Sequence, residues 1–410
     1  MMRILWLSDK MIGGYSAYSK VTYEVLTRLV EMGHTVAHIP LARANRMGKW
    51  VYKNILIYPS GEDPFCEDVV IKHYCDFKAD LLITLKDLWV FNIFFKFSVD
   101  YAPYLPIDHS PVSPSITSRL HTAFSVIVPS RFAQRELIQA DIDVPIHYIP
   151  HGVNTSIFRP LDKGKCKKIW FLDEDDFTVG IVAMNRARKM VHRMLRGYKL
   201  FKERNPDVKS HLLLWTDVRP RSRVYDGALS IGVADVGVNL LPEIMNLDLG
   251  EDVIWPESNL YREGIPDDGT DSWSMVTLYN AMDVLLLCSG GEGVGLPLLE
   301  AQSCGVPVIT TNYAGAPEHV GAGLVVPVSD YVILNTPGTR YALADLDKMA
   351  DYIAKIMNAD REKLSRRARR FAFKFDWDRV MRYWAKFLDW AECELYPKVS
   401  KGGVGTWISR

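Results

Sequence analysis

Short apolar runs alternate with amphipathic segments along the chain, and this alternation restricts the fold more than any other feature. In the first half the runs are residues 4–7, 35–39, 81–84, 104–107, 125–128 and 146–149. In the second half they are residues 178–183, 211–215, 253–255, 284–288, 306–310 and 323–326. Segments with helical periodicity, such as residues 16–32 and 131–140, lie between them. Such alternation is typical of parallel sheets that helices cover on both faces.

The stretch between the two halves, residues 150–177, differs from both in composition. It contains Pro160, Gly164, a cluster of lysines at residues 163–168 and an acidic run at residues 173–176. Charged, proline-containing stretches are typical of linkers. The chain of 410 residues is long enough for two or three domains of about 150 residues each. We therefore predict an α/β fold with two Rossmann-like doubly wound domains, residues 1–160 and 161–374, that face each other across a cleft.

Charge and cysteine content exclude several classes of protein. The chain has 49 basic and 49 acidic residues and a formal net charge of zero, without the basic excess that nucleic-acid-binding proteins show. Its six cysteines are scattered and form no CxxC pair, which argues against a zinc site or a disulfide framework. We therefore expect no nucleic-acid partner, and reduced thiols in a cytoplasmic protein.

The apolar stretches are too short to predict a membrane span. The N-terminal MMRILWLSDK lacks the features of a signal peptide and is predicted to be a first buried strand. No apolar run approaches the roughly 18 residues of a spanning helix. The longest candidate, residues 88–105, is interrupted by Asn92, Lys96 and Asp100. It is predicted to form a buried helix and strand, with a membrane-contacting surface as the alternative.

A glycine-rich loop, SGGEGVGLPLLE at residues 289–300, lies between an apolar run and a helical pattern. Its glycines allow the backbone to come close to a ligand: Gly290, Gly291, Gly293 and Gly295. Pro297 suits the first position of the helix that follows. A helix start with free N–H groups is a good site for a diphosphate. Because Glu292 and Glu300 flank this point, the loop predicts a nucleotide-sugar site.

Two further candidates follow strands in the first half. Gly13 and Gly14 come after the first strand, where they form either a tight turn or a second place for a phosphate or sugar. Asp108 and His109 follow the predicted strand 104–107. His109 is a candidate to hydrogen-bond a sugar hydroxyl or to polarise a backbone carbonyl, and a structural histidine is the alternative.

Basic residues follow a strand in the second half. The segment NRARK, residues 185–189, comes after the run 178–183. Positioned cations there would stabilise the charge on a departing diphosphate, and we assign that role to Arg188 and Lys189, with Arg186 behind them. A solvated basic face is the alternative. Glu300, predicted in the first helical turn, is the candidate to accept both hydroxyls of a ribose, with a structural role at the helix start as the alternative.

Taken together, these residues resemble the family 4 retaining glycosyltransferases of the GT-B fold. The paired glutamates of EGVGLPLLE, with SCGVPVITTNYAGAPEHV at residues 303–320, carry much of the resemblance. IPHGVNTSIFRP at residues 149–160 is similar to the family's segment at the end of the first domain. FDWDRVMRYWAKFLDW at residues 375–390 is similar to the helix that crosses back to that domain. By this resemblance, a helix at residues 375–395 completes the first, acceptor-side domain.

The resemblance implies transfer of a hexose from UDP- or GDP-hexose to a hydroxyl acceptor in glycan biosynthesis, with retained anomeric configuration. It implies that Glu300 binds the ribose and Glu292 the donor sugar, while Arg188 and Lys189 hold the diphosphate. Backbone amides would contact the sugar or phosphate at Gly293, Val294, Gly295 and Leu296. Gly13 and Gly14 would approach the diphosphate from the other side, and His109 would line the sugar site. No covalent nucleophile, metal or other cofactor is implied.

The sequence is also compatible with other functions. One is another enzyme of the same architecture, such as a sugar-nucleotide epimerase or a phosphorylase, although no segment clearly offers the lysine that would bind pyridoxal phosphate. Another is a non-catalytic sugar-nucleotide-binding protein. Residues 258–272 are predicted to be a surface loop, with a functional or mobile loop as the alternative. Residues 43–53 and 88–105 are hypothesised to meet a lipid-linked acceptor in peripheral contact with the inner membrane face.

Overall fold

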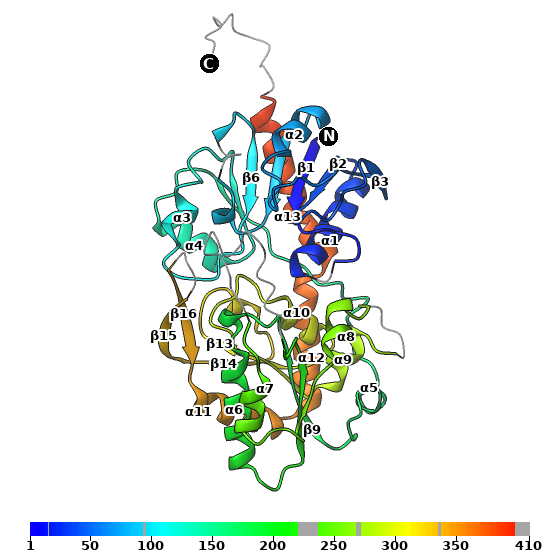
Figure 1. Cartoon of the computed structure of the whole chain (residues 1–410), viewed down its shortest axis with the longest axis vertical. Helices are drawn as coiled ribbons and strands as arrows, with labels where there is room; N and C mark the ends of the chain where they lie inside the picture. The colour runs from blue at the N-terminus through cyan, green and yellow to red at the C-terminus, as the bar shows by residue number, and fades with distance from the viewer. Residues whose placement is uncertain (15, 93–95, 220–236, 268–271, 335–337, 398–410) are drawn as a thin grey trace, which may run out of the picture.

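Each half of the chain forms its own parallel sheet, and the two sheets lie one above the other along the long axis (Figure 1). The computed structural model describes residues 1–14, 16–92, 96–219, 237–267, 272–334 and 338–397. The first sheet has the order β3-β4-β2-β1-β5-β6-β7-β8 and is parallel except for β3. Its strands are β1 Arg3–Ser8, β2 Thr35–Pro40, β3 Trp50–Tyr52, β4 Ile55–Ile57, β5 Leu81–Leu85, β6 Tyr101–Tyr104, β7 Val126–Val128 and β8 Ile146–Tyr148.

The second sheet is built from the second half and has the order β11-β10-β9-β12-β13-β14, with every pairing parallel. Its strands are β9 Phe177–Val182, β10 Ser210–Trp215, β11 Val253–Ile254, β12 Val284–Leu287, β13 Val308–Thr311 and β14 Gly323–Val326. An antiparallel hairpin, β15 Val328–Leu334 and β16 Thr339–Ala344, follows β14. The predicted α/β fold of two doubly wound units is therefore confirmed.

Helices connect the strands and cover the sheets. Those of the first half are α1 Ala17–Glu31, α2 Val70–Phe77, α3 Pro114–Thr117 and α4 Arg131–Gln139. Those of the second half are α5 Lys163–Ile169, α6 Val191–Arg204, α7 Leu241–Asn246, α8 Ser258–Glu263, α9 Met275–Ala281, α10 Leu296–Ser303, α11 Leu346–Met357, α12 Arg361–Ala372 and α13 Trp377–Leu395. Within the described ranges, none of these helices combines the length and the apolarity that crossing a membrane requires.

The predicted strand 104–107 is three residues out of place. The strand is β6, and Leu82 of β5 pairs with Tyr101 at its start. Pro106 has no N–H to donate to a ladder, so the strand ends before it. Asp108 and His109 consequently lie on a loop rather than directly at the strand end. The buried nature of the 88–105 stretch is confirmed for Leu88 and Phe91, while residues 93–95 lie outside the described ranges.

The predicted linker at residues 150–177 is wrong in its second part. Residues 163–169 form α5, whose start is capped by the side chain of Asp162. The ammonium of Lys167 is fully buried, 3.0 Å from the carboxylate of Asp283, and donates to the carbonyl oxygens of Glu174 and Asp176. The lysine cluster therefore includes a buried structural lysine. The predicted loop 258–272 is also wrong in part, since it begins with α8, and its residues 268–271 lie outside the described ranges.

The last helix returns to the first sheet, as the resemblance implied. Trp384 of α13 is completely buried, and its ring lies 5.7 Å from that of Trp6 in β1 and 5.5 Å from that of Tyr104 in β6. Figure 1 shows α13 running upward from the lower sheet behind β1. The chain therefore crosses between the two sheets twice, first after β8 and again before α13.

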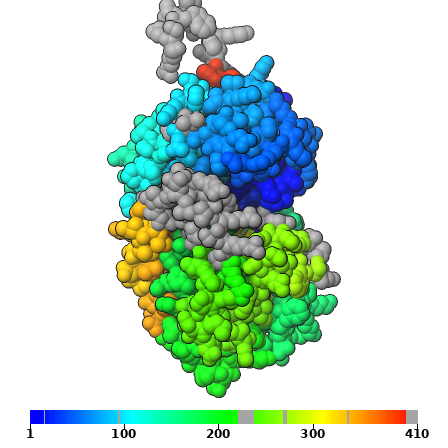
Figure 2. Space-filling view, in the orientation of Figure 1, coloured from blue at the N-terminus to red at the C-terminus, as the bar shows by residue number. Residues whose placement is uncertain are grey.

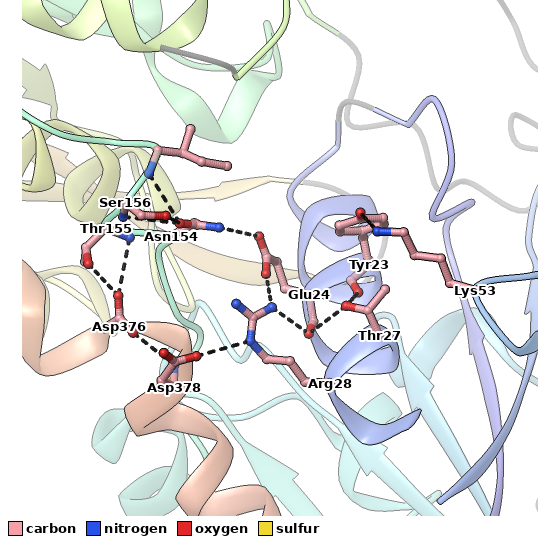
Figure 3. Close-up of polar contacts among 11 residues, drawn as sticks. Tyr23, Glu24, Thr27, Arg28, Lys53, Asn154, Thr155, Ser156, Asp376 and Asp378 are labelled. Atoms are coloured by element: carbon pink, nitrogen blue, oxygen red, sulfur yellow. Dashed lines mark hydrogen bonds and ion pairs between the residues drawn. The ribbon is translucent and has the colours of Figure 1, made fainter. Parts of the chain in front are cut away.

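The two crossings are bonded to each other and to α1. The N–H of Val153 donates to the carbonyl of Phe375 at 2.9 Å, which joins the first crossing to the second. Figure 3 shows how the α1 side chains reach both. Asn154 donates to a carboxylate oxygen of Glu24 at 3.5 Å, and Arg28, which also pairs with Glu24, lies 3.7 Å from Asp378. One helix of the first half thus holds both crossings.

Each sheet with its helices forms a lobe, and the two lobes also touch on the side of the hairpin β15–β16 (Figure 2). There the yellow-orange part of the lower lobe meets the cyan part of the upper one. The hydroxyl of Tyr313 accepts from the N–H of Ser110 at 2.9 Å. Glu318 accepts from the backbone N–H of Arg131 at 2.7 Å, at the start of α4. The lobes are therefore in direct contact on this side as well as at the crossings.

Candidate active site

The glycine-rich loop runs from the end of β12 to the start of α10, as predicted. Gly295 has φ +79° and precedes the first residue of α10, so Pro297 occupies the second helical position rather than the predicted first. At Gly291 an added Cβ would lie 2.1 Å from the carbonyl oxygen of Asp108, and at Gly293 one would lie 2.7 Å from that of Pro106. Glycine is required at these two positions because the backbone of the other lobe packs against the loop.

The glycine-rich loop places its carboxylate, Glu292, against the basic segment 185–189 that follows β9. The ammonium of Lys189 lies 2.6 and 2.7 Å from the two carboxylate oxygens of Glu292. Arg188 donates to the carbonyl of Gly291 at 3.0 Å and lies 3.3 Å from the carboxylate of Asp108. The predicted convergence of Arg188, Lys189 and Glu292 is present, and the first lobe contributes a second carboxylate to it.

This cluster is largely buried, and burial alters its protonation equilibria. Burial lowers the pKa of Lys189, the neighbouring charge of Arg188 lowers it further, and Glu292 opposes both. For Asp108 burial raises the pKa, but Arg188, His109 and Lys189 together outweigh burial, so the pKa is lowered. The site therefore holds two cations and two carboxylates in close contact, with Lys189 easier to deprotonate than an exposed lysine.

His109 is buried beside this cluster, at 5% exposure. Its Nδ1 lies 2.9 Å from a carboxylate oxygen of Asp108, and its Nε2 accepts from the backbone N–H of Ser113 at 3.2 Å. An acceptor role for Nε2 places the proton on Nδ1, which then donates to Asp108. Both ring nitrogens are bonded within the histidine's own loop, and a contact with a sugar hydroxyl stays a prediction.

Glu300 is the fifth residue of α10, beyond the first turn in which it was predicted. Its side chain is 7% exposed, and both carboxylate oxygens have partners. One accepts from the ammonium of Lys20 in α1 at 2.9 Å, and the other accepts from the hydroxyl of Tyr279 in α9 at 2.6 Å. Lys20 also lies 3.0 Å from Asp267. Glu300 thus takes part in a contact between the lobes.

The remaining predicted residues occupy different surroundings. Gly13 has φ +60° with open space around its Cβ position, whereas a Cβ on Gly14 would lie 2.3 Å from the hydroxyl oxygen of Ser19. Only Gly13 therefore has room beside it. Arg186 contacts the sulfur of Met184 at 3.3 Å, and its charge acts against the burial that raises the pKa of Tyr261 to about 12. It therefore lies on the α8 side of the basic segment.

Buried loop residues continue from the site into α10. Val294 and Leu296 are 4% and 7% exposed. The predicted contacts of the amides of Gly293, Val294, Gly295 and Leu296 with sugar or phosphate stay predictions. In the part of the chain that the structure describes, no group of three or more His, Cys, Asp or Glu side chains is arranged to hold a metal ion. The expectation that the reaction needs no metal ion is separate from this observation and stays a prediction.

Sequence reasoning missed Lys20, Tyr279 and Asp267. Lys20 follows the predicted glycine turn by six positions, but its partner Glu300 lies 280 positions further along the chain. Neither local composition nor periodicity reports a pairing at such a distance. The position of Lys20 in the first turn of the helix after the glycine pair was the one available signal.

Comparisons with known proteins agree with this architecture. Residues 269–374 match the sequence profile of the family described as glycosyl transferases group 1. Over 241 residues the chain is 27% identical to the D-inositol 3-phosphate glycosyltransferase of Actinosynnema mirum, which covers 57% of this chain and 48% of that protein. Over 89 residues it is 40% identical to the O-antigen chain mannosyltransferase B of Escherichia coli, covering 20% and 22%. The chain spans about half the length, or less, of these curated relatives.

Solved structures match over nearly the whole chain. Sucrose-phosphate synthase from Thermosynechococcus elongatus superimposes with a TM-score of 0.71 at 17% identity, over 96% of this chain and all of that one. Anabaena HepE in complex with UDP-glucose superimposes with a TM-score of 0.64 at 16% identity, over 95% and 100%. The chain therefore has the GT-B fold of glycosyltransferases, and its residues 269–374 are similar to the glycosyl transferases group 1 family.

Proposed function

We propose that the protein is a retaining glycosyltransferase of family 4 that moves a hexose from UDP- or GDP-hexose to a hydroxyl acceptor without a metal ion. The observation on which this rests most is the contact of Lys189 with both oxygens of Glu292, beside Arg188, at the glycine loop that starts α10. A diphosphate needs cations and a helix start, and a sugar needs a carboxylate for its hydroxyls. Both requirements meet at this point.

The relatives support this choice of substrate. HepE binds UDP-glucose, and two of the similar curated proteins are named as transferases acting on inositol phosphate and in O-antigen chains. By analogy this chain would bind a nucleotide sugar and pass the sugar to a hydroxyl group.

The charges at the site suit the departure of a nucleoside diphosphate. In this structure Arg188 and Lys189 are paired with the carboxylates of Asp108 and Glu292. A bound diphosphate would become the new partner of the two cations, which leaves Glu292 free to accept from hydroxyls of the donor sugar. As the sugar–phosphate bond breaks, negative charge grows on the diphosphate, and the cations stabilise it. The departing oxygen would take the acceptor's proton on the same face, so that configuration is retained.

The test is a transfer assay with a matched control. The protein is incubated with UDP- and GDP-hexoses and a panel of polyols and sugar phosphates, with chelator present, and release of UDP or GDP is measured. Proton NMR of the product reports the anomeric configuration. Lys189→Met should slow release by about 10²–10³-fold, whereas Lys199→Met on α6, where Lys199 pairs with Glu203, should not change it. Conversion of the donor to an epimer without acceptor, or binding without any turnover, would favour the epimerase or the binding protein instead.

We further propose that the protein acts in the cytoplasm and that a lipid-linked acceptor is met at residues 43–53. This stretch combines Arg46 and Lys49 with exposed apolar side chains, since Met47 is 88% and Val51 63% exposed. A basic surface with apolar tips suits an anionic bilayer. Sedimentation with vesicles of anionic phospholipid at low salt should carry the protein down. Equal recovery with neutral vesicles would remove this part of the proposal.

A further inference from the structure

The ion pair between Lys20 and Glu300 lies where the proposed donor must bind. Lys20 belongs to α1 of the first lobe and Glu300 to α10 of the second, and their charged atoms are 2.9 Å apart. The second oxygen of Glu300 accepts from Tyr279. Each carboxylate oxygen can accept more than one hydrogen bond, and each oxygen of Glu300 already accepts one from the protein. Two ribose hydroxyls would therefore share the carboxylate with Tyr279 and compete with Lys20, the charged donor from the other lobe.

Lys20 is held by more than one carboxylate. Its ammonium lies 3.0 Å from Asp267 as well as 2.9 Å from Glu300, and it lies 5.4 Å from the centre of the Phe158 ring. Burial alone would lower the pKa of Lys20, but Glu300 and Asp267 together raise it well above its ordinary value. Lys20 is therefore charged at neutral pH and has a second acidic partner already in place.

We propose that Lys20 is a positioning residue that pairs with the ribose-binding carboxylate until the donor binds, and that the donor ribose then displaces it onto Asp267. This inference rests on the proposed function, because it assigns Glu300 to a ribose. Until then the ammonium keeps a buried carboxylate paired. When two hydroxyls replace it as donors, Lys20 keeps its contact with Asp267 and does not become an unpaired buried charge.

The position of Lys20 on α1 links this exchange to the crossings between the lobes. Lys20 precedes Glu24 by about one helical turn in α1. Glu24 is the residue that contacts the first crossing through Asn154 (Figure 3). The same helix therefore touches Glu300 near its start and the crossings further along. Release of Lys20 from Glu300 removes one of the contacts that hold the lobes together, at the moment when the donor supplies new ones.

The test measures nucleotide affinity in two variants with opposite expected effects. UDP and GDP are titrated calorimetrically into the full chain. Lys20→Met removes the competing ammonium and should tighten binding of whichever nucleotide the unaltered chain binds by about tenfold, the effect of one ion pair. Asp267→Asn removes the second partner of Lys20 and should weaken the same binding several-fold.

The 2′,3′-dideoxy form of the same nucleotide separates this role from a general effect on structure. It cannot offer hydroxyls to Glu300, so its affinity should be the same for Lys20→Met and the unaltered chain. Weaker binding of UDP or GDP by Lys20→Met, or equal changes for the ribose and dideoxy forms, would overturn the proposal. If transfer and binding persist in that case, the proposed function stands. If neither nucleotide binds the unaltered chain or the variants, both proposals fail. Should Lys20→Met not fold, Lys20→Gln replaces it.

Discussion

Lys189 contacts both carboxylate oxygens of Glu292, at 2.6 and 2.7 Å, although the two residues lie on different loops of the second sheet. The loops meet because β9 and β12 are neighbours in that sheet, so the segments after them leave the same edge. A cation from one strand end and an acid from the next are thereby brought to one point. Several expectations depend on this contact and on others like it.

Lys189→Ala should lower turnover far more than it weakens nucleotide binding. The charge on the leaving diphosphate grows in the transition state, so loss of one positioned cation should cost about 10²–10³ in kcat. Steady-state kinetics combined with calorimetry of UDP or GDP separates the two effects. Loss of affinity with unchanged kcat would show that Lys189 acts in the ground state alone.

Glu300→Ala should weaken binding of the nucleoside diphosphate. Two ribose hydrogen bonds to a charged acceptor are lost, which corresponds to about 1.5–3 kcal/mol. Glu362→Ala on the exposed face of α12 is a suitable control, since its side chain is 80% exposed. Calorimetric affinity that is the same for Glu300→Ala and the control would exclude Glu300 from the nucleotide site.

Acid should destabilise the protein through buried histidines. Burial lowers the pKa of His151 from 6.5 to about 3. The unfolded chain binds the proton of His151 more tightly than the folded chain does. The contribution of His151 to the free energy of unfolding is therefore fully present above pH 6.5 and is lost as the pH falls towards 3. Between pH 7.5 and pH 5 the loss from this residue is about 2 kcal/mol. Urea unfolding at the two pH values measures it.

The pH effect has an internal check. His151→Gln should unfold with a smaller difference between pH 7.5 and pH 5 than the unaltered chain, because one titrating group is gone. His121→Gln, whose side chain is 65% exposed in the parent, should leave the difference unchanged. An equal pH dependence in all three proteins would mean that His151 is not the group that titrates.

Asp283→Ala should be among the most destabilising single changes in the second lobe. The variant leaves the fully buried ammonium of Lys167 without its carboxylate, and the loss of one partner of a buried ion pair costs about 3–5 kcal/mol. Lys163→Ala removes a partly exposed partner of the same aspartate and should cost no more than about 1 kcal/mol. Denaturant unfolding compares the two, and similar midpoints would contradict the assignment.

Much of the fold follows from local pattern. Strands buried on both faces are largely apolar, so runs such as residues 81–84 and 284–288 could be recognised from their own sequence alone. The helical segment predicted to begin at residue 16 is α1, whose N-cap is Ser16. The misplaced elements have local causes. β6 contains Pro103 and is followed by Pro106, so its apolar residues extend past its ladder. The hairpin β15–β16 was not predicted, although its strands VSDYVIL and TRYALA each contain a short apolar run.

Contacts between candidate residues were predictable where the residues follow strands of the same sheet. They were not predictable where the contact joins the two lobes. Glu292, Arg188 and Lys189 each follow a strand of one sheet, and sheet geometry alone brings them together. The contact of Lys20 with Glu300 depends on how the second lobe docks on the first. The same holds for Asp108, which reaches Arg188 from the other lobe. Such pairings depend on how the two lobes dock on each other, and local sequence pattern does not predict that docking.

The paired crossings between the lobes have a mechanical consequence. A single connecting strand would allow the lobes to swivel, twist and separate in any direction. Here two connecting segments lie side by side. They are joined by the hydrogen bond from Val153 to Phe375, and Glu24 and Arg28 of α1 contact one segment each. Twisting one lobe against the other would shear that bond, whereas bending about the line of the crossings would preserve it. Bending is therefore the motion that the crossings themselves oppose least, and the contacts of Tyr313 with Ser110 and of Glu318 with Arg131 are the bonds that would resist it.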